Sequence, residues 1–243
     1  MCKVKPMDTL KFRKVFRNHH VVLPVIHVET ETQALRNAKI AYDAGADGVF
    51  LINHSISWME LLLIHGKVAD RFPGWWIGVN CLDIDPRQVF AHIPYRVSGI
   101  WVDNAMIQED RSDQPQAEAV IEAQSQTKWS GLYFGGVAFK YQRHVGNLVS
   151  AAKIARRYMD VVTTSGPSTG QAAEIQKIST MKEALGEYPL AIASGITPNN
   201  VRDYLPFSDC YLVSTGISKT FSDFDSSLVH FLIDTIRSWS GHE

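Results

Sequence analysis

The stretch PLAIASGITPNNVRDYLPFSDCYLVSTGIS, residues 189–218, contains the pattern that decides the fold. Two short apolar runs, 189–193 and 210–213, are each followed by hydroxyl residues and a glycine. Between the runs, Thr197 and Pro198 are residue types favoured at a helix N-cap and at the first helical position. The stretch therefore predicts a strand, a tight glycine turn, a helix and a second strand, the repeating unit of a parallel sheet with crossover helices.

The same unit recurs along the whole chain. Short apolar runs begin near eight positions: Val21, Gly48, Ile77, Gly99, Gly131, Asp160, Pro189 and Cys210. Their spacing of about 20 to 30 residues is close to the roughly 30 residues of one strand-helix-strand unit. Eight units in 243 residues predict a single-domain α/β protein, a (β/α)₈ TIM barrel. An open doubly wound sheet is the alternative, and it is disfavoured because no G-x-G-x-x-G follows the first run.

Two of the predicted helices carry signals of their own. Thr30 and Gln33 have the spacing of a capping box, which opens a helix that ends at Gly45. The last helix follows Ser222, and its apolar spacing predicts one buried face formed by Leu228, Phe231, Leu232, Thr235, Ile236 and Trp239. We expect this face to cover the outside of the barrel.

The N-terminal end divides into a basic segment, residues 1–20, and the barrel, residues 21–243. The first twenty residues contain six Lys and Arg residues against one acid, Asp8, but no apolar run of the kind a secretory signal needs. An organelle transit peptide is the alternative. We disfavour it because Thr9 is the one Ser or Thr in the segment, which runs directly into a strand-like stretch.

Composition excludes several classes of protein. The chain is 45% hydrophobic and 20% charged, and 24 Lys and Arg residues against 25 Asp and Glu residues give a net charge of −1. This balance provides no global basic field for nucleic acid or an anionic membrane. The longest apolar run, 61–64, is far below the roughly 20 residues that span a bilayer. Three widely spaced cysteines, Cys2, Cys81 and Cys210, favour a reducing compartment, so we expect a cytoplasmic protein.

Polar side chains gather where the predicted strands end. In the first strand, Val21, Leu23 and Val25 share a face with His27 and Glu29, so apolar layers give way to polar residues at the mouth of the barrel. The active site of a TIM barrel lies at this carboxyl end of the strands. The other strands contribute Asn53, His54, Asn80, Cys81, Asp83, Asp103, Asn104, Lys140, Thr164, Ser165, Ser194, Gly195, Ser214, Thr215 and Gly216.

The ends of the last two strands predict a site for phosphate or another anion. Glycine turns at Gly195 and Gly216 free backbone N–H groups, and the loops after strands 7 and 8 are the recurrent phosphate site of TIM barrels. The alternative is that both glycines only permit tight turns. We expect a substrate or its phosphate to be bound by Ser194, Gly195, Ser214, Thr215, Gly216, Thr164, Ser165, Asn53, Asn80 and Asn104.

Lys140, His27 and Asp103 are the predicted catalytic residues. Lys140 ends the predicted strand 131–140, where it could form a Schiff base, bind an anion, or pair with a carboxylate such as Asp103, Asp83 or Glu29. For His27, acid/base work and a packed, hydrogen-bonded role are favoured equally. A divalent metal bound by His27 with Glu29 and His54 is less favoured, because the spacing is unspecific, and we predict no cofactor.

The sequence resembles the BtpA/SgcQ-type barrel family. The resemblance rests on the segments 164–170, 194–201 and 213–219, with Ile26-His27, the segment 44–49 and Lys140 similar in place. It implies a single (β/α)₈ barrel related to the phosphate-binding TIM barrels, in a family linked to photosystem I biogenesis or to phosphosugar or nucleoside chemistry.

The chain is a divergent member of this family. The family usually has a Pro/Gly-rich loop after the first-strand histidine, whereas the segment 28–32 here enters the helix directly. The family also tends to have Glu-Asn at the end of the second strand, where this chain has Asn53-His54. If the chemistry requires that acid, it is lost or relocated here.

We therefore expect a barrel that binds a small phosphorylated or phosphoribosyl-type metabolite at its C-terminal face. An enzyme using acid/base chemistry is favoured, as a lyase, an isomerase or a glycosyl or phosphoribosyl transferase. The alternative is a non-catalytic biogenesis or regulatory factor. The apolar stretches Trp58-Met59 and Leu61–Ile64 are consistent with a homo-oligomer, and a buried helix is the alternative interpretation of the same pattern.

Overall fold

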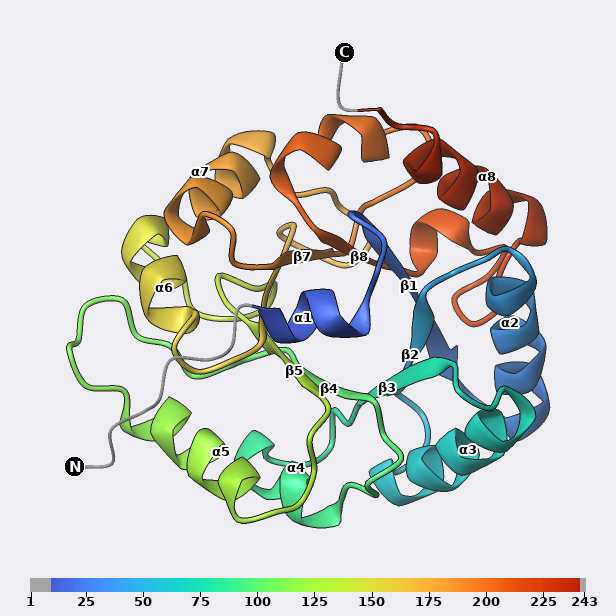
Figure 1. Ribbon diagram of the computed structural model, residues 1–243, viewed down its shortest axis with the longest axis horizontal. Helices are drawn as coiled ribbons and strands as arrows, with labels where there is room; N and C mark the ends of the chain where they lie inside the picture. Colours follow the sequence, from blue (N-terminus) through green and yellow to red (C-terminus); the bar gives the residue numbers. More distant parts are fainter. Residues whose placement is uncertain (1–9, 241–243) are drawn as a thin grey trace.

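A computed structural model describes residues 10–240 of the chain. Within this range the sheet is a closed barrel of parallel strands in the order β1 to β8, with helices on its outside (Figure 1), so the predicted single-domain TIM barrel is confirmed. The strands are β1 (Val21–Val28), β2 (Gly48–Asn53), β3 (Trp76–Asn80), β4 (Gly99–Val102), β5 (Leu132–Gly136), β6 (Val161–Ser165), β7 (Leu190–Ala193) and β8 (Cys210–Val213). The helices are α1 (Leu10–Val15), α2 (Glu31–Asp43), α3 (Trp58–Arg71), α4 (Pro86–His92), α5 (Pro115–Ser125), α6 (Leu148–Ala155), α7 (Ile175–Leu185) and α8 (Ser226–Arg237).

Helix α1 closes the N-terminal end of the barrel. In Figure 1 it lies across the near end of the strands, and Phe12 and Phe16 belong to the cluster that fills the barrel interior. The Phe16 ring lies 5.3 Å from that of Trp76, which packs in turn on Phe50. Part of the predicted basic segment 1–20 therefore packs into the barrel. Residues 1–9, with Cys2, lie outside the described residues.

The barrel interior is apolar from its N-terminal end, where α1 lies, through the middle of the strands, and polar residues appear at its C-terminal rim. Val21, Leu23 and Val25 of β1 belong to the interior cluster, which is the inner face that the two-residue period predicted. Alternate residues of the same strand, Val22 and Ile26, belong to the second cluster between the sheet and the helices. Because the interior is filled from the α1 side, space for a ligand remains only beyond these layers.

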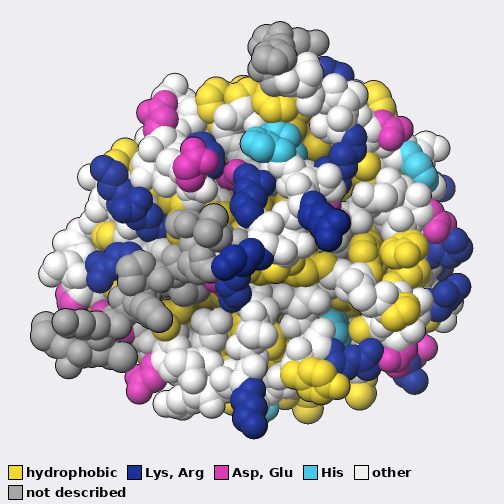
Figure 2. Space-filling view, viewed as in Figure 1, with side chains coloured by type: hydrophobic (Ala, Val, Ile, Leu, Met, Phe, Trp, Pro, Cys, Tyr) yellow, Lys and Arg dark blue, Asp and Glu magenta, His cyan; other side chains and the backbone are white. Residues whose placement is uncertain are grey.

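Three buried carboxylates fix the N-terminal starts of the strands. Asp47, Asp160 and Asp209 each stand just before a strand and accept the backbone N–H of a residue in the preceding strand, at 2.7, 2.8 and 2.9 Å. Each also has a cationic partner from outside the sheet: Arg237 of α8 for Asp47, Lys11 of α1 for Asp160, and both Arg13 of α1 and Lys182 of α7 for Asp209. Lys and Arg side chains accordingly gather over this end of the barrel (Figure 2).

Strand β5 is shorter than predicted. The prediction extended it from Gly131 to Lys140, whereas it ends at Gly136. A Cβ on Gly136 would lie 1.9 Å from the backbone oxygen of Asp103, so the backbone segments that end β5 and follow β4 are in close contact here. Ala138 then adopts φ of +48°, which no strand allows, and the chain leaves the sheet before Lys140.

The prediction of a helix beginning at Thr197 is wrong. The chain forms two short 3₁₀ turns instead, Val201–Asp203 and Leu205–Phe207. Thr197 does act as a cap, since its N–H donates to the side chain of Asn200 and its hydroxyl accepts the N–H of Asn200. Pro206 then stops an α-helix, because it lacks the N–H needed for a bond one turn back.

The buried face of α8 differs from the predicted one. Leu232, Thr235 and Ile236 are buried as expected and Trp239 is partly buried, but Val229 and Ile233 complete the face, while Leu228 and Phe231 are exposed. The helix is rotated about its axis relative to the prediction, so that residues 229, 232, 233 and 236, which share one side at a 3.6-residue period, pack against the core. On α3, Leu61 and Ile64 are buried whereas Met59 and Leu63 are exposed.

Among the described helices, none has both the length and the apolar character required to cross a membrane.

Truncating Phe12 tests whether α1 is an integral part of the barrel. The ring is 1% exposed, so we expect Phe12→Ala to lower the free energy of unfolding by about 3 kcal/mol. The matched control is Phe231→Ala, whose ring is 52% exposed and whose loss should cost less than about 1 kcal/mol. Urea unfolding followed by circular dichroism measures both. Equal effects of the two substitutions would show that α1 does not contribute to the barrel.

Candidate functional site

A cavity of about 250 Å³ lies at the C-terminal rim of the barrel, and we refer to it as the mouth cavity. The three predicted catalytic residues, Lys140, His27 and Asp103, all line it. Its remaining lining residues are Val25, Ile52, His54, Leu82, Trp101, Tyr141, Thr169, Ala193, Ser194, Leu212, Ser214, Thr215 and Phe221. The structure therefore brings together residues from the ends of all eight strands and the loops that follow them, up to 196 positions apart in sequence.

Lys140 reaches the mouth cavity from the β5–α6 loop. Its backbone N–H donates to Ser165 Oγ at 2.8 Å, and its Nζ donates to Ser194 Oγ at 2.9 Å and to Thr169 Oγ1 at 3.2 Å. Within residues 10–240 the structure records no ion pair between Lys140 and a carboxylate. Burial lowers the pKa of Lys140, and the charges of Asp103 and Tyr141 oppose this shift. The ammonium group thus faces the cavity with hydroxyl groups as partners.

Asp103 provides a carboxyl group on the cavity wall. It follows β4 and accepts a hydrogen bond from Asn80 Nδ2 at 2.9 Å. Burial raises the pKa of Asp103, while the bond from Asn80 and the charges of Lys140 and His54 act in the opposite direction. A partly buried carboxyl group with a raised pKa is a candidate for proton transfer.

His27 and His54 form a pair of uncharged rings beside this carboxyl group. Their ring centroids lie 4.8 Å apart, and both residues end neighbouring strands, β1 and β2. Burial lowers the pKa of His27 to about 4, with further lowering by His54 and Lys140. His27 Nδ1 is buried and has no hydrogen-bond partner. A neutral imidazole with a free nitrogen can accept or donate a proton at neutral pH.

Four hydroxyl groups line the cavity around Lys140. Thr169, Ser194, Ser214 and Thr215 supply them from the loops after β6, β7 and β8. Ser194 has φ of +81°, a conformation that residues other than glycine rarely adopt. Ser214 Oγ is buried without a partner. A strained backbone and an unused hydroxyl group at one place are typical of a binding site.

The two glycines predicted to bind phosphate lie beside the cavity and join the loops together. A Cβ on Gly195, whose φ is +74°, would lie 2.1 Å from the backbone nitrogen of Ala172. A Cβ on Gly216 would lie 1.9 Å from the carbonyl oxygen of Ile196. These close contacts pack the loops that follow β6, β7 and β8 against one another, and they position Ser194 and Thr215.

Several predicted binding residues do not line the cavity and form hydrogen bonds within the protein. Asn53 donates to Asp83 Oδ1 at 2.6 Å and accepts from the N–H of Leu82 at 2.8 Å. Thr164 donates to Ala138 O at 3.3 Å, and Ser165 Oγ bonds the backbone of Lys140 and of Gly166. Together with Asn80, which bonds Asp103, these residues hold the strand ends and the residues that face the cavity.

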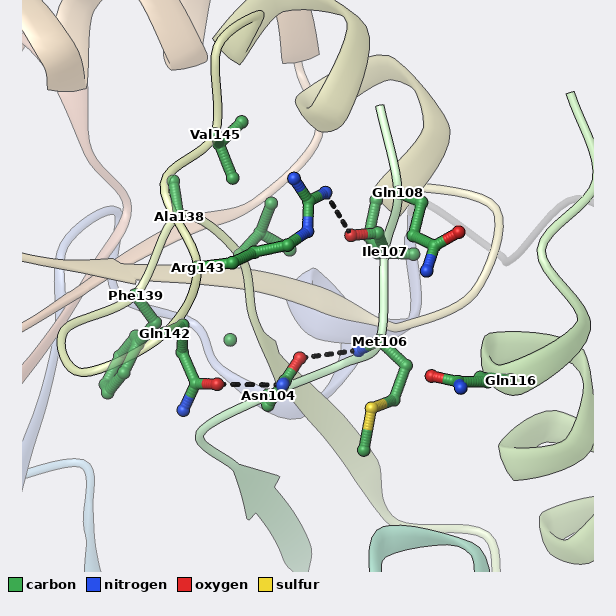
Figure 3. A pocket seen from close by; sticks show the side chains of 12 residues that line it. Asn104, Met106, Ile107, Gln108, Gln116, Ala138, Phe139, Gln142, Arg143 and Val145 are labelled. Carbon is green, nitrogen blue, oxygen red and sulfur yellow. Dashed lines mark hydrogen bonds between the residues drawn. The ribbon is translucent and has the colours of Figure 1, made fainter. Parts of the chain in front are cut away.

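Asn104 belongs to a neighbouring cavity of about 120 Å³ (Figure 3). Its Nδ2 donates to Gln142 Oε1 at 2.8 Å, and its Oδ1 accepts the N–H of Met106 at 2.9 Å. Arg143 crosses the same cavity and donates to Ile107 O at 3.0 Å. Asn104 therefore joins the β4–α5 and β5–α6 loops and is not among the residues that line the mouth cavity.

Lys177 is a contributor that the sequence did not reveal. It lies on α7, and its Nζ donates to the carbonyl oxygens of Ala138 and Ser165, both at 2.6 Å. Burial lowers its pKa to about 8. These two bonds fix the loop that carries Lys140. A lysine within a helix looks like a solvent-facing residue in sequence, so no local signal marks this role.

Thr169, Tyr141 and Phe221 also line the cavity without having been predicted as site residues. The segment 165–171 stands out in sequence as a loop rich in hydroxyl donors, which is the one signal that could have indicated Thr169. Across the described part of the chain, no group of three or more His, Cys, Asp or Glu side chains is placed to hold a metal ion. Glu29, which a metal site with His27 and His54 requires, does not line the cavity.

The fold and this cavity define a TIM-barrel protein with a candidate site at the C-terminal rim of the strands. Residues 64–236 match the model of the BtpA family. The chain therefore belongs to the BtpA family. Over 206 residues it is 23% identical to an uncharacterized protein of Pyrococcus furiosus, an alignment that covers 76% of each chain.

Solved structures with similar folds include two enzymes. Phosphoribosyl anthranilate isomerase from Thermotoga maritima superposes with a TM-score of 0.65 at 15% identity, covering 91% of this chain and 100% of the isomerase. The second is (S)-3-O-geranylgeranylglyceryl phosphate synthase from Thermoplasma acidophilum in complex with sn-glycerol-1-phosphate. It superposes with a TM-score of 0.66 at 17% identity, covering 98% of this chain and 100% of the synthase. At these identities the likeness shows the fold.

The lowered pKa of His27 predicts a pH dependence of stability. Its folded pKa is about 4 against an ordinary 6.5, so the unfolded chain takes up a proton first as the pH falls. The stability that this group contributes is fully present above pH 6.5 and is lost as the pH falls toward 4. On the order of 1 to 3 kcal/mol is lost in this way.

Urea unfolding between pH 7 and pH 4 measures this effect. His20 and His65 have the same folded pKa of about 4, so they contribute in the same direction. We expect His27→Asn to take up about one proton fewer on unfolding than the wild type near pH 5. His230→Asn, at an exposed position on α8, serves as the control. If the free energy of unfolding of His27→Asn changes with pH as steeply as that of the wild type, the assignment of a neutral, buried His27 is contradicted.

Proposed function

We propose that the mouth cavity binds a small phosphorylated metabolite, of the sugar phosphate or phosphoribosyl type, and catalyses a reaction on it by acid/base chemistry. The observation that carries this proposal is the environment of Lys140. Its Nζ is half-buried and bonds the hydroxyl groups of Ser194 and Thr169. No carboxylate of the described residues pairs with it in the structure. An ammonium group in such surroundings is suited to an anionic ligand.

A phosphate group fits the chemistry of this wall. Its oxygens accept hydrogen bonds from a lysine and from several hydroxyl groups at once, and here Ser214 and Thr215 add two more hydroxyl groups. The negative charge would also stabilise the protonated form of Lys140, which burial disfavours. In this proposal Gly195 and Gly216 shape the anion site by packing the loops that carry these hydroxyl groups.

Asp103 and His27 are the proposed proton-transfer groups. A carboxyl group with a raised pKa and a neutral imidazole can exchange protons with a substrate near neutral pH. A fixed phosphate with an acid/base pair serves isomerases, lyases and glycosyl or phosphoribosyl transferases alike. Asn53, Asn80, Thr164 and Ser165 act in this proposal as supports of these groups, and Asn104 serves the neighbouring loop.

The structural neighbours support the ligand class. The names and contents of the two solved structures refer to a phosphoribosyl compound and to sn-glycerol-1-phosphate. The open cavity supports ligand binding over a purely structural role, because no apolar side chain of residues 10–240 fills it. A cytoplasmic location and self-association through the exposed Met59 and Leu63 of α3 remain predictions.

Replacing Lys140 tests the anion site. We expect Lys140→Met to weaken the binding of ribose 5-phosphate about 30-fold, since a charge-assisted hydrogen bond contributes about 2 kcal/mol. Isothermal titration calorimetry measures the affinity. The control is Lys153→Met, at an exposed position on α6, which should bind as the wild type does. Equal affinities of Lys140→Met and the wild type would contradict the proposal.

Replacing Asp103 tests the acid/base role. Asp103→Asn keeps the size and the hydrogen bond to Asn80 but cannot accept a proton, so we expect phosphate binding within threefold of the wild type. NMR in D₂O detects exchange of substrate carbon-bound hydrogen across a panel of sugar phosphates. We expect Asp103→Asn to slow this exchange about 100-fold. If the wild type binds these compounds but neither exchanges hydrogen nor converts them, the non-catalytic alternative is favoured.

A further inference from the structure

We propose that the ligand of the mouth cavity carries a single planar ring with a hydrogen-bond acceptor on its edge, in addition to its phosphate. The ring would lie over the apolar floor of the cavity, against Phe221, and accept a hydrogen bond from Trp101 Nε1. This inference rests on the proposed function and narrows its substrate class. Simple aliphatic sugar phosphates, which lack a planar ring, fall outside the narrowed class.

The floor of the cavity is unsuited to a sugar. Val25, Ile52 and Leu212 line it together with Trp101, and all four belong to the interior core or its edge. Hydroxyl groups of a sugar placed against these side chains would lose their hydrogen bonds to water without replacement, which is costly. A flat unsaturated ring loses nothing there and gains dispersion contacts.

Unused hydrogen-bonding atoms point to where the ligand's polar atoms lie. Five buried side-chain atoms of the described residues have no partner, and three of them, His27 Nδ1, Trp101 Nε1 and Ser214 Oγ, are on residues that line the mouth cavity. The proposed function uses His27 and Ser214. Trp101 remains, and because an indole nitrogen can only donate, its partner must be an acceptor. A buried donor without a partner costs about 1 to 3 kcal/mol, which a ligand acceptor would recover.

Two of the aromatic rings that line the cavity are exposed to solvent. Phe221, in the β8–α8 loop, is 50% exposed and lies 4.1 Å from the His27 ring centroid and 5.3 Å from that of His54. Tyr141, in the β5–α6 loop, is 73% exposed, and its hydroxyl group accepts the N–H of Thr169 at 3.1 Å. Large aromatic rings left open to solvent beside a cavity are suited to stacking on a ligand ring.

The volume of the cavity limits the ring to one. A cavity of about 150 Å³ holds a benzene molecule. The mouth cavity, at about 250 Å³, therefore has room for one six-membered ring and a phosphate-bearing arm. Lys140 and Ser194 lie at the phosphate end, and Trp101 and Phe221 lie at the ring end. The chemical class is a phosphate ester of a monocyclic, nitrogen- or oxygen-bearing planar ring.

Calorimetric titration with two phosphate esters tests this inference. Pyridoxine 5′-phosphate has a planar ring with acceptors and no aldehyde to react with Lys140, whereas ribose 5-phosphate has no planar unsaturated ring. We expect the wild type to bind the ring compound at least tenfold more tightly. Phe221→Ala and Trp101→Phe should each remove most of this preference while leaving ribose 5-phosphate affinity within twofold. Phe231→Ala, an exposed ring on α8, is the matched control and should change neither affinity.

The outcomes separate the two proposals. Ribose 5-phosphate bound as tightly as the ring compound, or a Phe221→Ala variant that weakens both equally, would overturn the ring inference and leave the phosphate site standing. If neither compound binds the wild type, the proposed function itself fails, and the ring inference fails with it. Circular dichroism melting of Trp101→Phe verifies folding, and Phe221→Ala, at an exposed position, gives an independent answer if that variant unfolds.

Discussion

Closure of the sheet between β1 and β8 is the constraint on which the rest of the structure depends. A parallel sheet that stayed open would leave a row of unpaired backbone groups at each edge. Pairing of Val21–Pro24 with Cys210–Val213 removes both edges and places the carboxyl ends of all the strands on one rim. The carboxylates of Asp47, Asp160 and Asp209 bond strand starts at the opposite end and tie them to α1, α7 and α8.

The two ends of the barrel differ in structure: the interior is filled by side chains, whereas the loops of the C-terminal rim contain strained residues. Below, aromatic and branched side chains leave no room for a ligand, so the barrel serves as a rigid support. At the C-terminal rim lie the four non-glycine residues that have positive φ within residues 10–240, namely Met106, Ala138, Tyr141 and Ser194. Each such residue costs about 1 kcal/mol or more. Lys177 and the close contacts of Gly195 hold these loops in place.

The electrostatics of the mouth follow from burial more than from net charge. Desolvation lowers the pKa of His27 and of Lys140 and raises that of Asp103, so burial disfavours the protonated histidine, the charged amine and the carboxylate alike. A bound anion would shift Lys140 back toward its charged form. A chain with a net charge of −1 can thus present a local anion site, because one correctly placed cation suffices.

The sequence by itself determined the number of strands, their parallel order and the inner face of β1, because hydrophobic periodicity and turn residues are local properties. It also placed Lys140, His27, Asp103, Ser194, Ser214 and Thr215 at the strand ends, and all six line one cavity. It did not determine that β5 ends at Gly136, since this depends on the backbone of Asp103 in the neighbouring strand. Nor did it separate Asn53 and Asn104 from the cavity, or reveal Lys177, Trp101 and Phe221. These roles depend on contacts between loops distant in sequence, and only the closed barrel decides which of those loops meet.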